Sequence, residues 1–212
     1  MTNSSYEQKK AILIEEITAA FDGVSREDGI TLHEAMALDN YGGPEERRVA
    51  RAQDTEVKWQ DVSHEDIRSS DAVLHFLDPK GFQYYIPAFL VWYLIYMDSD
   101  DPDFWSDNFD SVDYQLDAGG TGDIKDIYLS KFKFLTLEQS KAVAHFLDLM
   151  AEKEDLYLAE EEALRQAEIA RGDISREKSD AHLENVKRNR AYHGISENHA
   201  RHSLNRYWGQ FL

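Results

Sequence analysis

The sequence contains no cysteine, so disulfide bonds and thiolate metal sites are excluded and the redox compartment stays open. It also lacks a long hydrophobic run. Its most apolar stretch, residues 81–97, is shorter than the roughly 20 residues that a membrane-spanning helix needs, and it carries Gln83 and Pro87. The polar N-terminus has no apolar stretch of the kind that secretory signals contain. These absences predict a cytoplasmic protein without a membrane partner.

Basic side chains are scarce, with 23 Lys and Arg against 41 Asp and Glu, a net charge of −18. Such a charge repels phosphate, so neither nucleic acid nor an anionic membrane surface is expected as a ligand. It favours a basic protein as the partner. The 212 residues, 42% of them hydrophobic, are enough for one domain with a sizeable core.

Motifs for catalysis are absent as well. There is no G-x-S-x-G elbow, and the glycines of residues 119–122 are followed by Asp123 instead of the Lys-Ser/Thr of a phosphate-binding loop. His193, His199 and His202 gather near the C-terminus, but the H-E-x-x-H helix of zinc enzymes is missing. We therefore expect no enzyme, cofactor or metal site. A metal-dependent enzyme that uses this histidine cluster stays open as an alternative.

Helical patterns dominate what is present. Residues 5–22 place Ile12, Leu13 and Ile17 on one face of a first helix. Thr31 begins a second helix and Pro44 a third, and Ser63 with Asp66 marks another start. Residues 123–135 fit a helix or a strand. The whole predicts a mainly α protein of roughly seven to nine helices.

The apolar block is expected to hold a buried helix at the centre of the core. Asp78, Pro79, Lys80 and Gly81 have the composition of a turn. Pro87 fits the first turn of a helix, so we expect a helix over residues 87–97 and an extended entry over residues 81–86.

A long acidic helix is predicted in the second half of the chain. Thr136 and Gln139 form a capping box, and Gly172 provides a stop signal. An uninterrupted helix over residues 136–171 would be about 50 Å long and would overhang a small domain. Its apolar residues fit either a solvated surface helix or a helix whose stripe docks another chain.

The C-terminal segment differs in charge. Residues 171–212 contain eight Lys and Arg and five Asp and Glu, a net +3, which leaves −21 for the preceding residues. We therefore expect a single compact helical domain with that long acidic helix, formed by residues 1–170, and a basic C-terminal helical arm, residues 171–212. The arm would pack on the acidic body of its own chain or on a second copy, which would give a homo-oligomer.

An acidic segment with interleaved aromatic residues follows the apolar block. Acids around a tryptophan are typical of a surface that receives a basic, partly apolar partner. The segment does not match a calcium-binding EF-hand loop, because Pro102 and Asp103 occupy the positions where an EF-hand needs a ligand and a glycine. The alternatives are a solvated loop and a partner-binding patch. The candidate partner-binding residues are Asp98, Asp100, Asp101, Asp103, Trp105, Asp107 and Asp110, with Glu160, Glu161 and Glu162 of the acidic helix as a second choice.

Three local patterns carry a family resemblance. They are Trp59 followed by AVLHFL at 72–77, GFQYYIPAFL at 81–90 and FLTLEQSKAVAHFLDLM at 134–150. Together they resemble the bacterial domain of unknown function family 6714 over about residues 59–150. The matching positions are mostly apolar or capping residues, so the resemblance implies a shared core. It implies no activity and no site residues.

These observations lead to one functional hypothesis. The chain is expected to be a small acidic protein-binding protein, in its concrete form an immunity protein that neutralises a basic, nuclease-type bacterial toxin by occluding it. Its acidic face would imitate the phosphates that such a toxin binds. The alternatives are a self-assembling structural protein and the metal-dependent enzyme named above.

Overall fold

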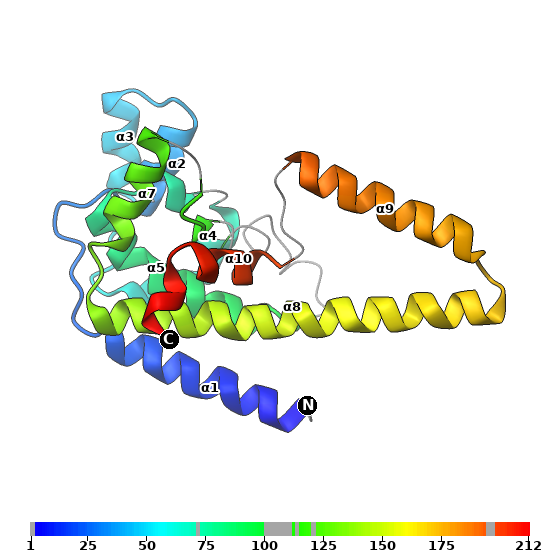
Figure 1. The fold of residues 1–212 in the computed structure, drawn as a ribbon. Coiled ribbons are helices and arrows are strands. Elements are labelled where there is room, and N and C mark those ends of the chain that lie inside the picture. Colours follow the sequence, from blue (N-terminus) through cyan, green and yellow to red (C-terminus); the bar gives the residue numbers. More distant parts are fainter. Residues whose placement is uncertain (1–2, 71–72, 100–111, 113–114, 120–121, 194–197) are drawn as a thin grey trace.

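The computed structural model describes residues 3–70, 73–99, 112, 115–119, 122–193 and 198–212, and every regular element within these ranges is a helix (Figure 1). This confirms the mainly α prediction. The α-helices are α1 (Asn3–Ala20), α2 (Leu32–Asp39), α3 (Pro44–Arg51), α4 (His64–Ser69), α5 (Pro79–Tyr96), α7 (Asp123–Phe132), α8 (Leu137–Arg171), α9 (Arg176–His193) and α10 (His199–Arg206). Short 3-10 helices are η1 (Trp59–Asp61), η2 (Val73–His75) and η4 (Trp208–Phe211).

Helix α5 forms the centre of the core. Its buried side chains include Phe82, Tyr85, Phe89 and Trp92. Helices α1, α4 and α7 and the short helix η1 pack against it, and α8 packs against α1 and α10. The apolar block is therefore buried, as predicted. None of the described helices combines the length and the apolar character needed to cross a membrane.

The start of α5 corrects the sequence prediction. The expected turn at residues 78–81 is wrong, because Asp78 is an N-cap, and its Oδ1 accepts hydrogen bonds from Gly81 N at 3.0 Å and Ile30 N at 2.8 Å. Pro79 occupies the first turn, where its missing N–H costs nothing. A Cβ on Gly81 would collide with the carbonyl oxygen of Ile30, so the close approach of the preceding loop requires glycine.

The expected start at Pro87 is also wrong, as is the extended entry over residues 81–86. Pro87 lies inside α5, where it removes one backbone hydrogen bond. The helix is continuous through this point, and residues 84–90 are all buried. Packing around the whole circumference of α5 compensates for the lost bond.

The other helix starts agree with the sequence. Thr31, Ser63 and Thr136 are N-caps whose side chains accept a hydrogen bond from the backbone N–H three residues on. The Thr136 capping box is complete, since Thr136 N donates to Gln139 Oε1 at 3.0 Å. The ambiguous segment over residues 123–135 is largely the helix α7.

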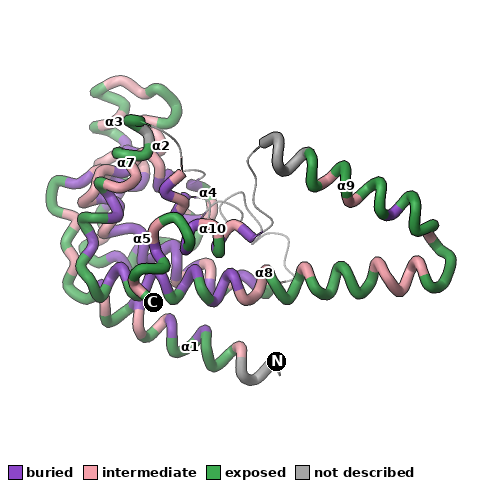
Figure 2. Tube along the Cα trace, viewed as in Figure 1, coloured by how far each residue is buried: buried purple, intermediate pink, exposed green. Residues whose placement is uncertain are grey.

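Helix α8 is as long as predicted and overhangs the domain. Its buried residues end at Ala151, and its described residues beyond that point are half-buried or exposed (Figure 2). Gly172 ends it in the left-handed conformation, with φ of 80°. Helix α9 then turns back from the far end of α8 (Figure 1).

The last part of the basic arm packs on the body of its own chain. Asn198 donates to Ala151 O at 2.9 Å, and Arg201 pairs with Asp155 at 2.6 Å. Trp208 is fully buried and its Nε1 donates to Leu116 O at 2.8 Å. Residues 198–212 thus belong to the same core as α5 and α8.

Candidate functional site

Of the predicted partner-binding residues in the acidic segment, only Asp98 lies within the described residues. Asp98 accepts from Lys10 Nζ at 2.7 Å and from Lys153 Nζ at 2.6 Å, so it ties the end of α5 to α1 and α8. Partial burial opposes ionisation, but the two lysines hold the pKa of Asp98 below its usual value. Asp98 is therefore neutralised within the chain. The remaining predicted residues of this segment, Asp100, Asp101, Asp103, Trp105, Asp107 and Asp110, lie outside the described residues.

The second predicted set lies on the projecting part of α8. Glu162 is bound by Arg165 and Gln166, which lower the pKa of its carboxyl to about 2. Glu161 accepts a hydrogen bond from the Tyr157 hydroxyl at 2.9 Å, and Glu160 is exposed. Glu162 is thus paired on its own helix.

A groove between α1 and α8 was not predicted from the sequence. The two helices run antiparallel, and two hollows of about 330 and 430 Å³ lie along their seam and share Glu16. The first is lined by Lys9, Ile12, Leu13, Glu16, His145, Asp148, Leu149 and Glu152. The second is lined by Glu16, Ala19, Ala20, Thr136, Glu138 and Lys141.

The groove has an apolar base and an acidic rim. Lys9 pairs with Glu152 at 2.7 Å, and His145 Nδ1 lies 2.7 Å from Glu16 Oε1. Asp148 and Glu138 are exposed beside these pairs. With four carboxylates against two lysines among the lining residues, the surface attracts cations.

Ile12 is the groove residue that the sequence pattern assigned wrongly. The helical pattern predicts Ile12 on the buried face of the first helix, whereas its side chain is 57% exposed in the groove. The helical pattern identified the face correctly for Leu13 and Ile17, which are buried. Ile12 lies at the edge of that face, so only the position of α8 decides its exposure.

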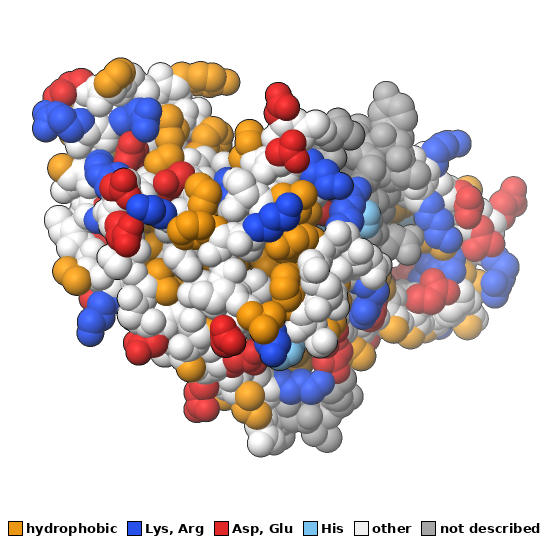
Figure 3. All heavy atoms as spheres, turned by 60° about the vertical axis from the view of Figure 1, so that its left-hand side comes forward, with side chains coloured by type: hydrophobic (Ala, Val, Ile, Leu, Met, Phe, Trp, Pro, Cys, Tyr) orange, Lys and Arg blue, Asp and Glu red, His pale blue; other side chains and the backbone are white. Residues whose placement is uncertain are grey.

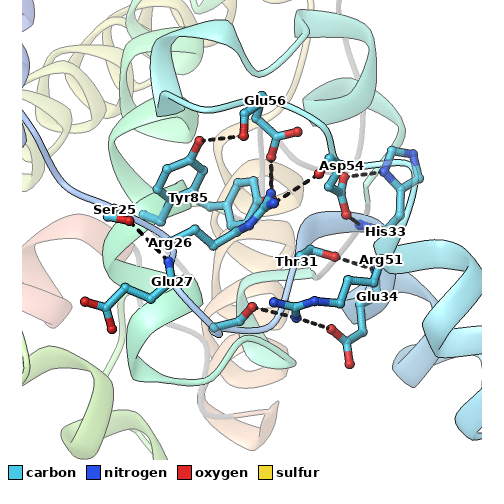
Figure 4. Close-up of polar contacts among 12 residues, drawn as sticks. Ser25, Arg26, Glu27, Thr31, His33, Glu34, Arg51, Asp54, Glu56 and Tyr85 are labelled. Atoms are coloured by element: carbon cyan, nitrogen blue, oxygen red, sulfur yellow. Dashed lines mark hydrogen bonds and ion pairs between the residues drawn. The ribbon is translucent and has the colours of Figure 1, made fainter.

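A partly buried polar network joins two loops to the core (Figure 4). Arg26 donates to Glu56 Oε1 at 2.6 Å, to the Tyr85 hydroxyl at 2.7 Å and to Asp54 O at 3.0 Å. Tyr85 in turn donates to Glu56 at 2.6 Å. Burial and the neighbouring carboxylates raise the pKa of Tyr85, which keeps its hydroxyl protonated as a donor.

The network continues to α2 and α3. Asp54 accepts from His33 N at 3.0 Å and lies 2.6 Å from His33 Nδ1 (Figure 4). Glu34 is held by Arg47 and Arg51, both at 2.8 Å. Every carboxylate of this network has a cationic or hydrogen-bonding partner in the chain. We therefore assign it a structural role, in fixing the loops on either side of α2 and α3.

A second buried cluster surrounds Lys131 of α7. Its Nζ donates to the carbonyls of Leu74 and His75, at 3.0 and 2.6 Å, and the Tyr128 hydroxyl lies 2.8 Å from His75 Nδ1. Burial lowers the pKa of Lys131 to about 8, and burial and the nearby Lys131 charge lower that of His75 to about 4. His75 is therefore neutral in the folded protein at pH 7.

The depressed pKa of His75 predicts a loss of stability in mild acid. The unfolded chain binds a proton at the ordinary histidine pKa, while the folded chain binds it only near pH 4, so the stabilising contribution present above about pH 6.5 is lost as the pH falls toward 4. We expect a loss of about 2 kcal/mol between pH 7 and pH 4.5 attributable to this group. Urea unfolding of wild type and His75→Gln at both pH values measures it. An equal pH dependence in both proteins would contradict the prediction.

Metal binding finds no support in the described part of the chain. Among those residues, no group of three His, Asp or Glu side chains could hold a metal ion. His199 and His202 lie on α10, where His202 Nε2 is 3.9 Å from Asp117. The side chain of His193 is outside the described part.

Charges of both signs are mixed on the face seen in Figure 3, with hydrophobic side chains between them. Helix α3 carries the exposed Arg48–Glu45 pair. When opposite charges pair locally in this way, the net electrostatic field at the surface is small. The face turned toward α2 and α3 is thus a weaker candidate for a cation-binding surface than the groove.

A family model described as "Family of unknown function (DUF6714)" matches residues 9–171. The match is wider than the resemblance over about residues 59–150, since it takes in most of α1 and all of α8. It ends where α8 ends, before α9. No curated protein and no solved structure matches the chain.

Proposed function

This chain belongs to the DUF6714 family, whose function is unknown, and we propose that it binds a basic protein through the groove between α1 and α8. The observation that carries the proposal is the acidic rim of the groove around an exposed isoleucine. Asp148, Glu138 and Glu16 surround a base that includes Ile12 and Leu149. Most of α1 and all of α8 lie within the family match.

A basic amphipathic helix fits such a surface. Its apolar side would cover Ile12, which is 57% exposed, and its lysines or arginines would approach the carboxylates of the rim. The net charge of −18 would attract this partner over a distance and speed its association. The acids at residues 100–110 add to this net negative charge.

The concrete form of the proposal is an immunity protein in the cytoplasm that occludes a basic, nuclease-type bacterial toxin. Its acidic surface would occupy the phosphate-binding surface of the toxin. The charge and the groove support this form, because an enzyme that binds nucleic acid offers a strongly basic surface.

Neutralising the rim of the groove is expected to weaken partner binding. The partner is first captured on the tagged chain, eluted by a salt gradient and identified by mass spectrometry. Its dissociation constant is then measured by calorimetry for wild type and for Asp148→Asn combined with Glu138→Gln. We expect roughly a tenfold weaker affinity at low salt and a smaller difference at high salt, because the lost attraction is screened.

The matched control is Glu45→Gln combined with Glu65→Gln, which removes the same charge from exposed carboxylates on α3 and α4. An equal loss in the control would show a general charge effect and overturn the groove as the site. If only Asp100→Asn, Asp101→Asn and Asp103→Asn weakened the affinity for the partner, the binding site would be the acidic segment and not the groove.

A further inference from the structure

The projecting part of α8 exposes an apolar stripe that the core does not cover. Leu156, Tyr157 and Leu164 are 42%, 60% and 59% exposed. At 100° per residue, Ala163 and Ala167 fall on the same side of the helix as these three. We call these five residues the α8 stripe.

Helix α9 lies against a different side of α8. Arg165, whose position is about 100° from Leu164, donates to Ser179 at 2.9 Å and to Asp180 at 3.2 Å. Leu183 and Val186 of α9 are half-buried on the same inner face as Ser179. Because α9 is held on that side, the α8 stripe faces away from it.

The stripe has charges of both signs along its length. Glu160 lies between Leu156 and Leu164 on the same side of the helix, and Arg171 lies one turn beyond Ala167. Arg171 pairs with Asp173 at 2.7 Å, and both side chains of this pair are more than half exposed. An exposed ion pair of this kind contributes little to the free energy of folding, and its members can exchange partners.

We propose that the α8 stripe is the contact surface of a homodimer, in which α8 packs antiparallel on α8 of a second copy. When Leu164 lies opposite Ala167 of the partner subunit, Glu160 lies opposite Arg171 of the partner subunit. The two-fold axis produces this pair twice. A parallel arrangement would instead align Glu160 with Glu160 and Arg171 with Arg171.

The small side chains favour the same arrangement. Ala163 and Ala167 let two helices approach closely, and Leu164 supplies the apolar area that leaves water where the two helices overlap. Because α8 ends at Arg171, Leu156 and Tyr157 lie at the outer edges of the contact, beside the end of α8 of the partner subunit. The groove with its Ile12 and Asp148 lies nearer the other end of α8, so a dimer would leave it open. The dimer is thus independent of the proposed function.

Disrupting the stripe is expected to dissociate the dimer. Sedimentation velocity of the full chain over a concentration series gives the dissociation constant of wild type and of Leu164→Glu. The substitution places two charges in the contact, so we expect at least a hundredfold weaker association. Since Leu164 is exposed, circular dichroism should show an unchanged fold. Val57→Glu, at a side chain that is 82% exposed on a distant loop, is the matched control and should leave association unchanged.

Exchanging the charges tests the antiparallel register. Glu160→Arg and Arg171→Glu should each weaken the dimer by roughly three- to tenfold, and the double variant should recover most of that loss, because the pair is restored with its signs reversed. Recovery supports the register. Losses that add in the double variant overturn it.

Two other outcomes overturn the dimer itself. One is a wild-type chain that stays monomeric at about 100 μM, where a specific contact of micromolar affinity would be nearly saturated. The other is a dimer that Leu164→Glu and Val57→Glu affect equally.

Discussion

Replacing Trp208 with alanine is expected to lower the free energy of unfolding by about 3–5 kcal/mol, the usual cost of removing a large buried aromatic side chain. Trp208 is fully buried, its ring centroid lies 4.7 Å from that of Phe132, and its Nε1 donates to Leu116 O. The alanine would leave a cavity between α7 and α8 and an unpaired carbonyl on Leu116. Urea unfolding followed by circular dichroism measures the change.

Trp208 lies in the basic arm, beyond the end of the family match at residue 171. A large loss would show that the end of the arm is part of the fold in solution. Leu212→Ala is the control, at an exposed residue of the same segment, and should change stability by no more than about 0.5 kcal/mol. A loss below about 1 kcal/mol for Trp208→Ala would mean that the arm does not pack on its own chain.

Removing Arg26 is expected to cost about 3 kcal/mol, because it leaves its three acceptors in a partly buried site without their donor. The side chains of Arg26 and Glu56 are 18% and 13% exposed, and Arg26 also lies 5.6 Å from the Tyr84 ring centroid. Arg26→Ala would leave the Glu56 carboxylate without its cationic partner, with the Tyr85 hydroxyl beside it. Thermal and urea unfolding of the variant measure the loss.

The control for Arg26 is Arg48→Ala, which breaks an exposed pair with Glu45 and should cost less than about 0.5 kcal/mol. A double-mutant cycle with Glu56→Gln separates the pair from its surroundings. We expect strong coupling, so that Arg26→Ala costs much less once Glu56 is neutral. Additive losses from the two substitutions would contradict the assignment of Arg26 and Glu56 to one network.

Local sequence determined most of the helix boundaries. Thr31, Ser63 and Thr136 each cap a helix through a contact that spans three residues, so the signal and the structure it produces lie in the same short segment. The length of α8 and its end at Gly172 are local in the same way. The burial of most of residues 81–97 followed from their composition alone.

The start of α5 shows where local signals become ambiguous. Asp78 and Pro79 fit a turn and a helix start equally well. The tertiary contact that accompanies the helix is the second hydrogen bond of Asp78, from Ile30 N, which lies 48 residues away. Pro87 similarly fits a helix start, and only the packing around α5 makes it an interior residue.

The candidate surfaces depended still more on tertiary structure. Negative charge was evident from composition, but the pairing of Asp98 with Lys10 and Lys153 joins residues 88 and 55 positions apart. The groove exists because α1 and α8 pack antiparallel, which also decides that Ile12 is exposed and Leu13 buried. By itself, the sequence determined most of the helices, the caps at Thr31, Ser63 and Thr136 and the acidic charge, because these depend on neighbouring residues. Only the tertiary structure decided which charges are neutralised and which apolar side chains stay exposed, because both depend on contacts between distant segments.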